Sequence, residues 1–157
     1  MSQPEPCIPF RVLFAYTDQL AKRWFAYFAA HPAALDIDIG GQTGSLGNLV
    51  AHIVQVEAFF AAPQAPPRVE RNQPEWADLQ RLHEDAVARF EGFLGRCTEA
   101  DIDATVAFGS RSVSRRKMLT QAALHSVHHW AQVAMAVRQA GFPAEKPQDF
   151  ILSDVMD

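Results

Sequence analysis

The sequence has few cysteines, no long apolar run and no excess of basic residues, and each deficit excludes a class of protein. Only Cys7 and Cys97 occur among 157 residues, so we expect no disulfide framework and a reducing cytoplasm as the compartment. No apolar run approaches the roughly 20 residues that span a bilayer, and the start "MSQPEPCIPF" lacks the basic segment of a signal peptide. The net charge of −4 is poorly suited to nucleic-acid backbones. We therefore expect a soluble protein that binds neither membranes nor nucleic acids.

Several common catalytic motifs are also missing. No Glu-x-x-His of a di-iron bundle is present, and "HEDAV" at His83 lacks the second histidine of a zinc-peptidase motif. The sequence contains no Gly-x-Ser-x-Gly elbow and no glycine-rich phosphate loop after a strand. These chemistries are therefore not expected.

Helical periodicity is what the sequence does contain. Apolar residues recur at three- and four-residue steps in four segments, about Phe10–Ala30, Ser45–Ala61, Pro74–Arg96 and Ser114–Ala140. The proline-rich stretch 62–74 and the stretch 98–113 are long connections, the second with some extended backbone near Val106–Phe108. The sequence predicts an all-α fold, a four-helix bundle with long crossover connections, as one domain over residues 1–157.

Three histidines lie among apolar residues of two helical segments. His125 and His129 are four residues apart, so they share one helix face. His52 stands between Val50 and Ile53, so we expect it to be at least partly buried. Three imidazoles that leave coordination positions open are typical of reactive transition-metal sites. We predict that His52, His125 and His129 bind one divalent metal ion, with zinc or nickel as the first candidates.

The two helical segments share a polar pattern around these histidines. In each, a polar residue stands four positions before a histidine and a glutamine stands three positions after it. The residues are Asn48, His52 and Gln55 in one segment and His125, His129 and Gln132 in the other. Metal-bound histidines usually need outer partners that fix their orientation. We therefore predict that Asn48, Gln55 and Gln132 surround the metal or line its pocket.

Other histidines have less specific interpretations. His128 lies on the same broad face, where it would be an outer hydrogen-bond donor, a substrate contact or a residue bonded to backbone. His31 precedes Pro32 in a loop and His83 lies in an acidic helical stretch, so both are expected to be solvated.

A basic cluster precedes the last helical segment. Its members are Arg111, Arg115, Arg116 and Lys117. Cations at the start of a helix oppose its dipole. A solvated surface turn is one interpretation, and a site for a carboxylate or phosphate of a substrate or partner is the other.

Taken together, these segments resemble the DinB/YfiT-like family of metal-binding four-helix bundles. The resemblance is carried by "LFAYTDQLAKRWFAYF", "TGSLGNLVAHIVQVEAFF", "HSVHHWAQVAMAVRQAGFP" and "QDFILSD". The third stretch is similar to the family's His-x-x-His-His-x-Gly-Gln run, although Ala131 stands at the glycine and Trp130 at a position that is often basic or aromatic. The resemblance implies that His52, His125 and His129 are the metal ligands.

The resemblance also implies a range of functions. Some related proteins are transferases or isomerases that use low-molecular-weight thiols such as bacillithiol or mycothiol. Because a metal lowers the pKa of a bound thiol or water, the first hypothesis is a metal- and thiol-dependent transferase or hydrolase acting on a small molecule. A non-catalytic metal-binding stress or accessory protein is the second, and histidines that serve packing or dimerisation are the third. No residue is identified as catalytic.

The aromatic content favours association. A four-helix core cannot easily hide 11 Phe and 3 Trp, and exposed apolar patches usually mark an interface. We expect a homodimer that forms through the first or third helical segment.

Overall fold

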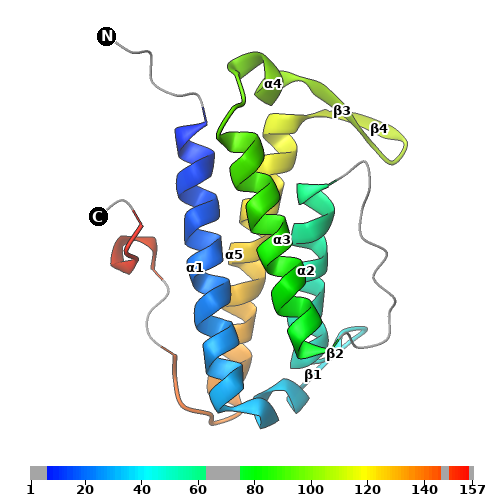
Figure 1. The fold of residues 1–157 in the computed structure, drawn as a ribbon. Helices are drawn as coiled ribbons and strands as arrows, with labels where there is room; N and C mark the ends of the chain where they lie inside the picture. The colour runs from blue at the N-terminus through cyan, green and yellow to red at the C-terminus, as the bar shows by residue number, and fades with distance from the viewer. Residues whose placement is uncertain (1–6, 63–74, 146–148, 156–157) are drawn as a thin grey trace.

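The computed structural model describes residues 7–62, 75–145 and 149–155, and most of them are helical. Four long helices lie side by side (Figure 1). They are α1 (Ile8–Ala30), α2 (Leu46–Ala61), α3 (Trp76–Leu94) and α5 (Arg115–Gln139). In Figure 1, α1 and α5 run in one direction and α2 and α3 in the other, with α2 packed against both α3 and α5. The predicted helical fold is therefore confirmed.

The starts of α2 and α5 follow from serine caps. The Ser45 hydroxyl accepts a hydrogen bond from the Asn48 backbone N–H, and the Ser114 hydroxyl accepts one from the Lys117 backbone N–H. Each cap satisfies a backbone donor that has no partner inside the helix. The predicted first residue of the third helix, Pro74, lies outside the described residues.

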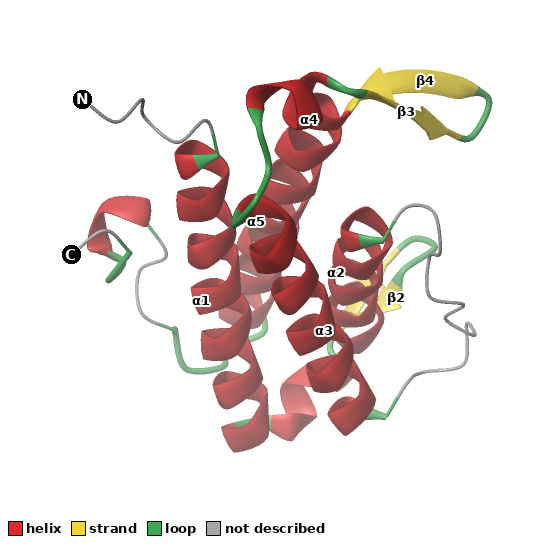
Figure 2. Ribbon diagram, turned by 45° about the horizontal axis from the view of Figure 1, so that its top comes forward, coloured by secondary structure: helices red, strands yellow, loops and turns green. Residues whose placement is uncertain are grey.

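Two small antiparallel hairpins accompany the helices, at different ends of the bundle (Figures 1 and 2). The first pairs β1 (Asp38–Gly40) with β2 (Gly44–Ser45), and follows the 3-10 helix η1 (Pro32–Asp36). The second pairs β3 (Thr105–Phe108) with β4 (Arg111–Ser114), after the short helix α4 (Glu99–Asp103). A 3-10 turn, η2 (Phe150–Leu152), lies near the C-terminus. The extended backbone expected near Val106–Phe108 is present, whereas the first hairpin is too short to produce an alternating pattern in the sequence.

Aromatic packing in the core fixes the rotation of α5. Trp24 of α1 and Trp130 of α5 are each 1% exposed, and their rings are nearly parallel with centroids 6.3 Å apart. A buried tryptophan contributes a large apolar area and packs in few orientations. Because Trp130 points into the core, the preceding His129 is turned about 100° away around the helix.

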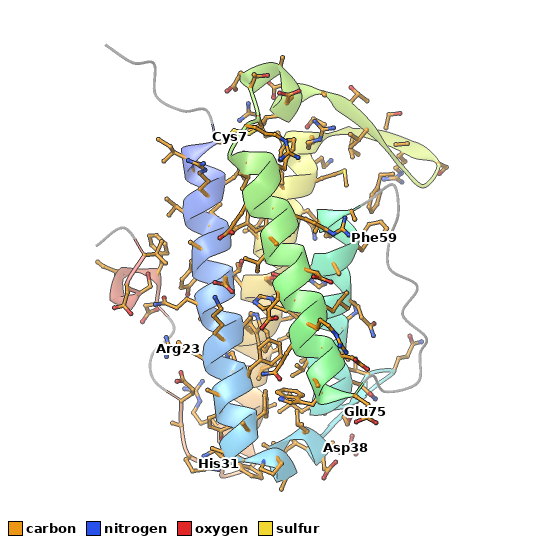
Figure 3. All side chains as sticks on the ribbon, in the orientation of Figure 1. Cys7, Arg23, His31, Asp38, Phe59 and Glu75 are labelled. Carbon is orange, nitrogen blue, oxygen red and sulfur yellow. A yellow bond between two sulfur atoms is a disulfide. The ribbon has the colours of Figure 1, made fainter. Side chains whose placement is uncertain are left out.

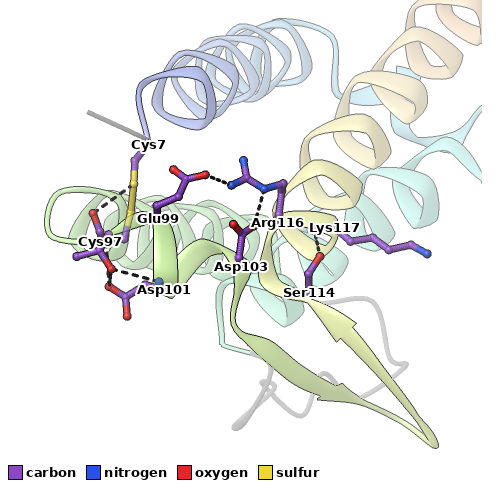
Figure 4. Close-up of polar contacts among 9 residues, drawn as sticks. Cys7, Cys97, Glu99, Asp101, Asp103, Ser114, Arg116 and Lys117 are labelled. Carbon is purple, nitrogen blue, oxygen red and sulfur yellow. Dashed lines mark hydrogen bonds and ion pairs between the residues drawn. A yellow bond between two sulfur atoms is a disulfide. The ribbon is translucent and has the colours of Figure 1, made fainter. Parts of the chain in front are cut away.

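The expectation of no disulfide framework is not met. Cys7 and Cys97 form a disulfide, which joins the start of α1 to the loop after α3 (Figure 4). The two residues are separated by 90 positions, so their spacing gives no sign that both lie at the same end of the bundle.

Most large aromatic side chains are buried, and the exposed apolar residues are dispersed. Those on the long helices are Ile8 and Leu13 of α1 and Leu124 and Met135 of α5. Within the described ranges, no helix combines the length and the apolar character needed to cross a membrane.

Candidate metal site

Three histidines from two neighbouring helices converge on one point. His52 comes from α2, and His125 and His129 come from α5. The Nε2 atoms of His52 and His125 are 3.2 Å apart, and the centroids of the His125 and His129 rings are 4.4 Å apart. One ring nitrogen from each histidine lies within 4.8 Å of the other two. The structure therefore brings together the three histidines that the sequence singled out.

The histidines converge because each stands next to a core residue. Ile53 and Trp130, the residues after His52 and His129, are almost fully buried. A side chain one position earlier is rotated by about 100° around the helix, which places it at the border between α2 and α5 instead of in the core. His125 lies one turn before His129 on the same face.

The site is more open than the sequence suggested. His125 and His129 are half-buried, whereas His52 is exposed at the rim, although its ring has lost enough solvent to lower its pKa. Its apolar neighbours Val50 and Ile53 point into the core, while His52 itself points to the rim.

Burial and mutual repulsion keep the His52 and His125 imidazoles neutral. Burial lowers the pKa of His125 to about 4, and the nearby His129, His52 and His128 act in the same direction. Loss of solvent around the ring, followed by the proximity of His129, also lowers the pKa of His52. Near neutral pH both rings are uncharged, so each has a nitrogen lone pair available to a ligand.

Gln132 links two of the histidines. Its side-chain oxygen accepts a hydrogen bond of 2.6 Å from Nδ1 of His129, and its amide nitrogen donates one of 3.2 Å to Nε2 of His128. This arrangement places the His129 proton on Nδ1 and leaves Nε2 free to coordinate. His128 thus contacts the residue that orients His129, and its role around a metal stays a prediction.

Asn48 and Gln55 have less direct positions. The Asn48 side-chain amide donates a 2.8 Å hydrogen bond to the backbone oxygen of Thr43, which fastens the first hairpin to α2. Gln55 is half-buried on α2 and makes no hydrogen bond to the three histidines within the described part of the chain. A role for either residue around a metal stays a prediction.

Two clefts meet at the histidines. The first, of about 760 Å³, has walls of mixed polarity, and we call it the polar cleft; it lies between the first hairpin and the second half of α5. Its polar lining residues are Asp38, Thr43, His52, His129, Gln132 and Gln139.

The second cleft, of about 610 Å³, lies against the β3–β4 hairpin, and we call it the aromatic cleft. Its lining includes Val56, Phe60, Phe108, Arg111, Lys117, Met118, Gln121 and His125. Asp38 of the polar cleft and Phe59, which contacts Phe108 at the aromatic cleft, lie toward opposite ends of α2 (Figure 3). The candidate site can therefore be reached from two sides.

The basic cluster divides into two parts. Arg115 donates a 2.5 Å hydrogen bond to the backbone oxygen of Asp101 and lies over the Phe93 ring. Arg116 is paired with Asp103 and Glu99 of α4 (Figure 4).

The other two cations, Arg111 and Lys117, line the aromatic cleft. Neither interpretation of the cluster therefore covers all four residues. Arg115 and Arg116 hold the α4 segment against α5, whereas Arg111 and Lys117 face the aromatic cleft.

The structure contains a second histidine site, at His83, that was not predicted from the sequence. The expectation that His83 is solvated is wrong. His83 of α3 is 1% exposed. Its Nδ1 lies 2.6 Å from a Glu57 carboxylate oxygen of α2, and its Nε2 lies 3.0 Å from an Asp18 carboxylate oxygen of α1. Burial alone would lower the pKa of His83, but the hydrogen bonds to both carboxylates outweigh it and raise the pKa to about 9.

A signal for this burial does exist in the sequence. Leu79, His83, Ala86 and Phe90 follow the four- and three-residue steps of a core-facing stripe, and all four are buried. The acidic residues beside His83 in the chain, Glu84 and Asp85, point outward. The partners of His83 come instead from other helices, which the local sequence does not reveal.

Comparisons with known proteins agree with this fold. Residues 1–150 match the family model described as DinB family. The chain is similar in structure to the crystal structure of a DinB family member from Shewanella denitrificans, with a TM-score of 0.60, 12% identity, and coverage of 94% of this chain and 89% of that one. At this identity the likeness supports the fold alone. No curated protein matches the sequence.

Proposed function

The chain belongs to the DinB family, and from that premise we propose that it binds one divalent transition-metal ion through His52, His125 and His129. The observation that carries the proposal is the approach of one nitrogen from each ring to within 4.8 Å of the others. Three nitrogens at about 2.0–2.1 Å from a tetrahedral ion lie about 3.3 Å from one another. The His52 and His125 nitrogens are already 3.2 Å apart, which is close to that spacing.

The donor set narrows the choice of metal. Neutral imidazoles suit zinc, nickel, copper or iron, whereas magnesium and calcium prefer oxygen ligands. Zinc and nickel are the first candidates. A set of three protein ligands leaves at least one coordination position for an exogenous ligand.

We further propose that the site supports a metal- and thiol-dependent transfer reaction on a small molecule. When bound, the metal ion would lower the pKa of a coordinated thiol or water. The protein's own contribution is orientation, because Gln132 holds the His129 ring through its Nδ1. Two clefts that touch different histidines suit two reactants better than hydrolysis, in which water is the second reactant.

Metal analysis of protein purified without a histidine tag tests the binding step. We expect about one zinc or nickel ion per chain, and loss of that ion in His52→Ala, His125→Ala and His129→Ala. His31→Ala is the matched control and should retain the metal, because His31 caps the end of α1 and lines neither cleft. Full metal loading of all three single variants would contradict the proposed ligand set.

A cobalt-loaded sample tests the chemistry. Coordination of a thiol such as glutathione, mycothiol or bacillithiol should produce a sulfur-to-cobalt charge-transfer band. Metal binding without any thiol coordination would support the alternative, a non-catalytic metal-binding stress or accessory protein.

Association as a homodimer remains a prediction. The structure gives less reason to expect a dimer than the composition does, because the phenylalanines of α1 are buried. They are Phe10, Phe14, Phe25 and Phe28. Leu124 and Met135 of α5 offer exposed apolar surface, as do Ile8 and Leu13 of α1. Light scattering at micromolar concentration decides between a mass near 17.4 kDa and twice that value.

A further inference from the structure

Arg111 and Lys117 are the two members of the basic cluster that have no polar partner for their side chains among the described residues. Their neighbours Arg115 and Arg116 are held by Asp101, Asp103 and Glu99. In Figure 4 the Lys117 side chain extends away from the acidic groups that bind Arg116. Both free cations line the aromatic cleft, so they are available to a ligand there.

The wall of this cleft is apolar and partly open to solvent. The rings of Phe60 and Phe108 are parallel, with centroids 6.2 Å apart, and Phe59 packs edge-on against Phe108. Phe108 is 39% exposed at the end of β3. The register of the second hairpin pairs Phe108 with Arg111, which places an aromatic ring and a cation side by side at the mouth.

The cleft runs along one face of α5 toward the candidate metal site. Lys117, Gln121 and His125 follow one another at four-residue steps, and all three line it. Lys117 and His125 are therefore separated by about 12 Å along the helix axis. A single small molecule can contact the cations at one end and approach the histidines at the other.

The charges of the two clefts differ. The lining of the polar cleft includes Asp38 and, among the described residues, no lysine or arginine. The aromatic cleft has Arg111 and Lys117 and no acidic residue in its described lining. An anion is thus favoured on the aromatic side and disfavoured on the other.

We propose that the aromatic cleft binds a small organic anion with an apolar body. Its carboxylate or phosphate ester pairs with Arg111 and Lys117, its apolar body packs on Phe60 and Phe108, and its far end reaches the site at His125. Arginine forks and lysine ammonium groups bind both kinds of anion. The assignment of the far end as the reacting end rests on the proposed function, whereas anion binding itself does not.

Calorimetric titration of the full chain tests the proposal with three probes that share one apolar body: 4-phenylbutyrate, 4-phenylbutyl phosphate and the neutral 4-phenylbutyramide. Metal-free protein is used first, because a carboxylate then has no metal to ligate. We expect at least one of the anions to bind about tenfold more tightly than the amide, consistent with charge-assisted hydrogen bonds. The stronger of the two anions identifies the anionic group. Equal affinity for anions and amide would overturn the proposal.

The variant Arg111→Gln/Lys117→Gln should reduce the affinity for the anion by about tenfold and leave binding of the amide unchanged. The matched control Arg81→Gln/Arg138→Gln changes the net charge equally, at positions outside the described lining of either cleft, and should bind the anion as the wild type does. An equal loss in both double variants would show general electrostatics and overturn the proposal.

Zinc content separates this inference from the proposed function. Both double variants should bind as much zinc as the wild type, because none of the four residues belongs to the histidine set. A chain that prefers anions but binds no metal would refute the proposed function and keep the cleft assignment. A chain that binds metal without any preference for anions would refute the cleft assignment and keep the proposed function.

Discussion

The bundle contains two histidine sites whose electrostatics are opposite. At the α2–α5 border, His52, His125 and His129 have other histidines as neighbours, and the pKa values of His52 and His125 are lowered. Between α1, α2 and α3, His83 lies between Glu57 and Asp18, and its pKa is raised to about 9. The first group offers lone pairs and the second is a cation near neutral pH.

One helix supplies residues to both sites. His52 and Glu57 of α2 are five positions apart, which separates them by about 140° around the helix. His52 is exposed and Glu57 is buried. Burial lowers the pKa of the histidines at both sites, and at His83 the two carboxylates outweigh it.

The largest expected effect comes from breaking the buried site. His83→Ala leaves the buried Glu57 carboxylate without its partner, while the half-buried Asp18 keeps Lys22. Removal of one member of a buried ion pair typically costs about 3–5 kcal/mol. Urea unfolding should show a loss of that size, with zinc binding by the folded protein unchanged. His83→Gln, which keeps one hydrogen-bonding amide, should lose less. A loss below about 1 kcal/mol for His83→Ala would mean that solvent reaches the carboxylates freely.

The second effect is the pH dependence of stability. The folded pKa of His83 is about 9, above its unfolded value of about 6.5. The folded state therefore holds the proton more tightly, so the contribution of His83 is fully present below pH 6.5 and is lost as the pH rises through 9. The free energy of unfolding of the wild type should fall by about 3 kcal/mol more than that of His83→Gln between pH 6.5 and 9.5. Parallel curves for the two proteins would contradict the assigned charge.

A smaller effect is expected from Gln132 at the open site. Gln132→Ala removes the acceptor that fixes His129 through Nδ1, and loss of such an outer partner typically weakens metal binding by about 10–100-fold. Competition with a chromophoric chelator measures the affinity. Gln80→Ala on α3 is the matched control, and Gln55→Ala tests whether the second predicted glutamine acts on the metal at all. An unchanged affinity in Gln132→Ala would mean that His129 is oriented by packing alone.

The smallest effect is expected from His128. His128→Ala removes the acceptor of the Gln132 amide but leaves the bond between Gln132 and His129. We expect a change in zinc affinity of less than about threefold, because the bond that orients His129 is kept. A loss as large as that of the ligand variants would show that His128 itself coordinates the metal.

The parts of this structure that depend on local periodicity could be predicted from the sequence. The four long helices follow from apolar spacing, and the shared face of His125 and His129 follows from their four-residue step. Their convergence with His52 required knowledge that α2 and α5 are neighbours, which the family resemblance implied and periodicity did not.

The features that the sequence did not reveal join distant segments. The partners of His83 lie 65 and 26 positions away, and the roles of Arg115 and Arg116 depend on the fold of α4. Ion pairs of this kind are set by tertiary packing, and nothing in the residues adjacent to His83 or Arg116 specifies them.

The disulfide between Cys7 and Cys97 has a topological consequence. It closes a covalent ring that contains α1, α2 and α3, while α5 begins at Arg115, outside the ring. Loop closure restricts the unfolded ensemble of the ring only, so in the unfolded chain α1, α2 and α3 are tethered and α5 is not. A metal ion bound by His52 of the ring and by His125 and His129 of α5 would add a reversible link between the ring and α5.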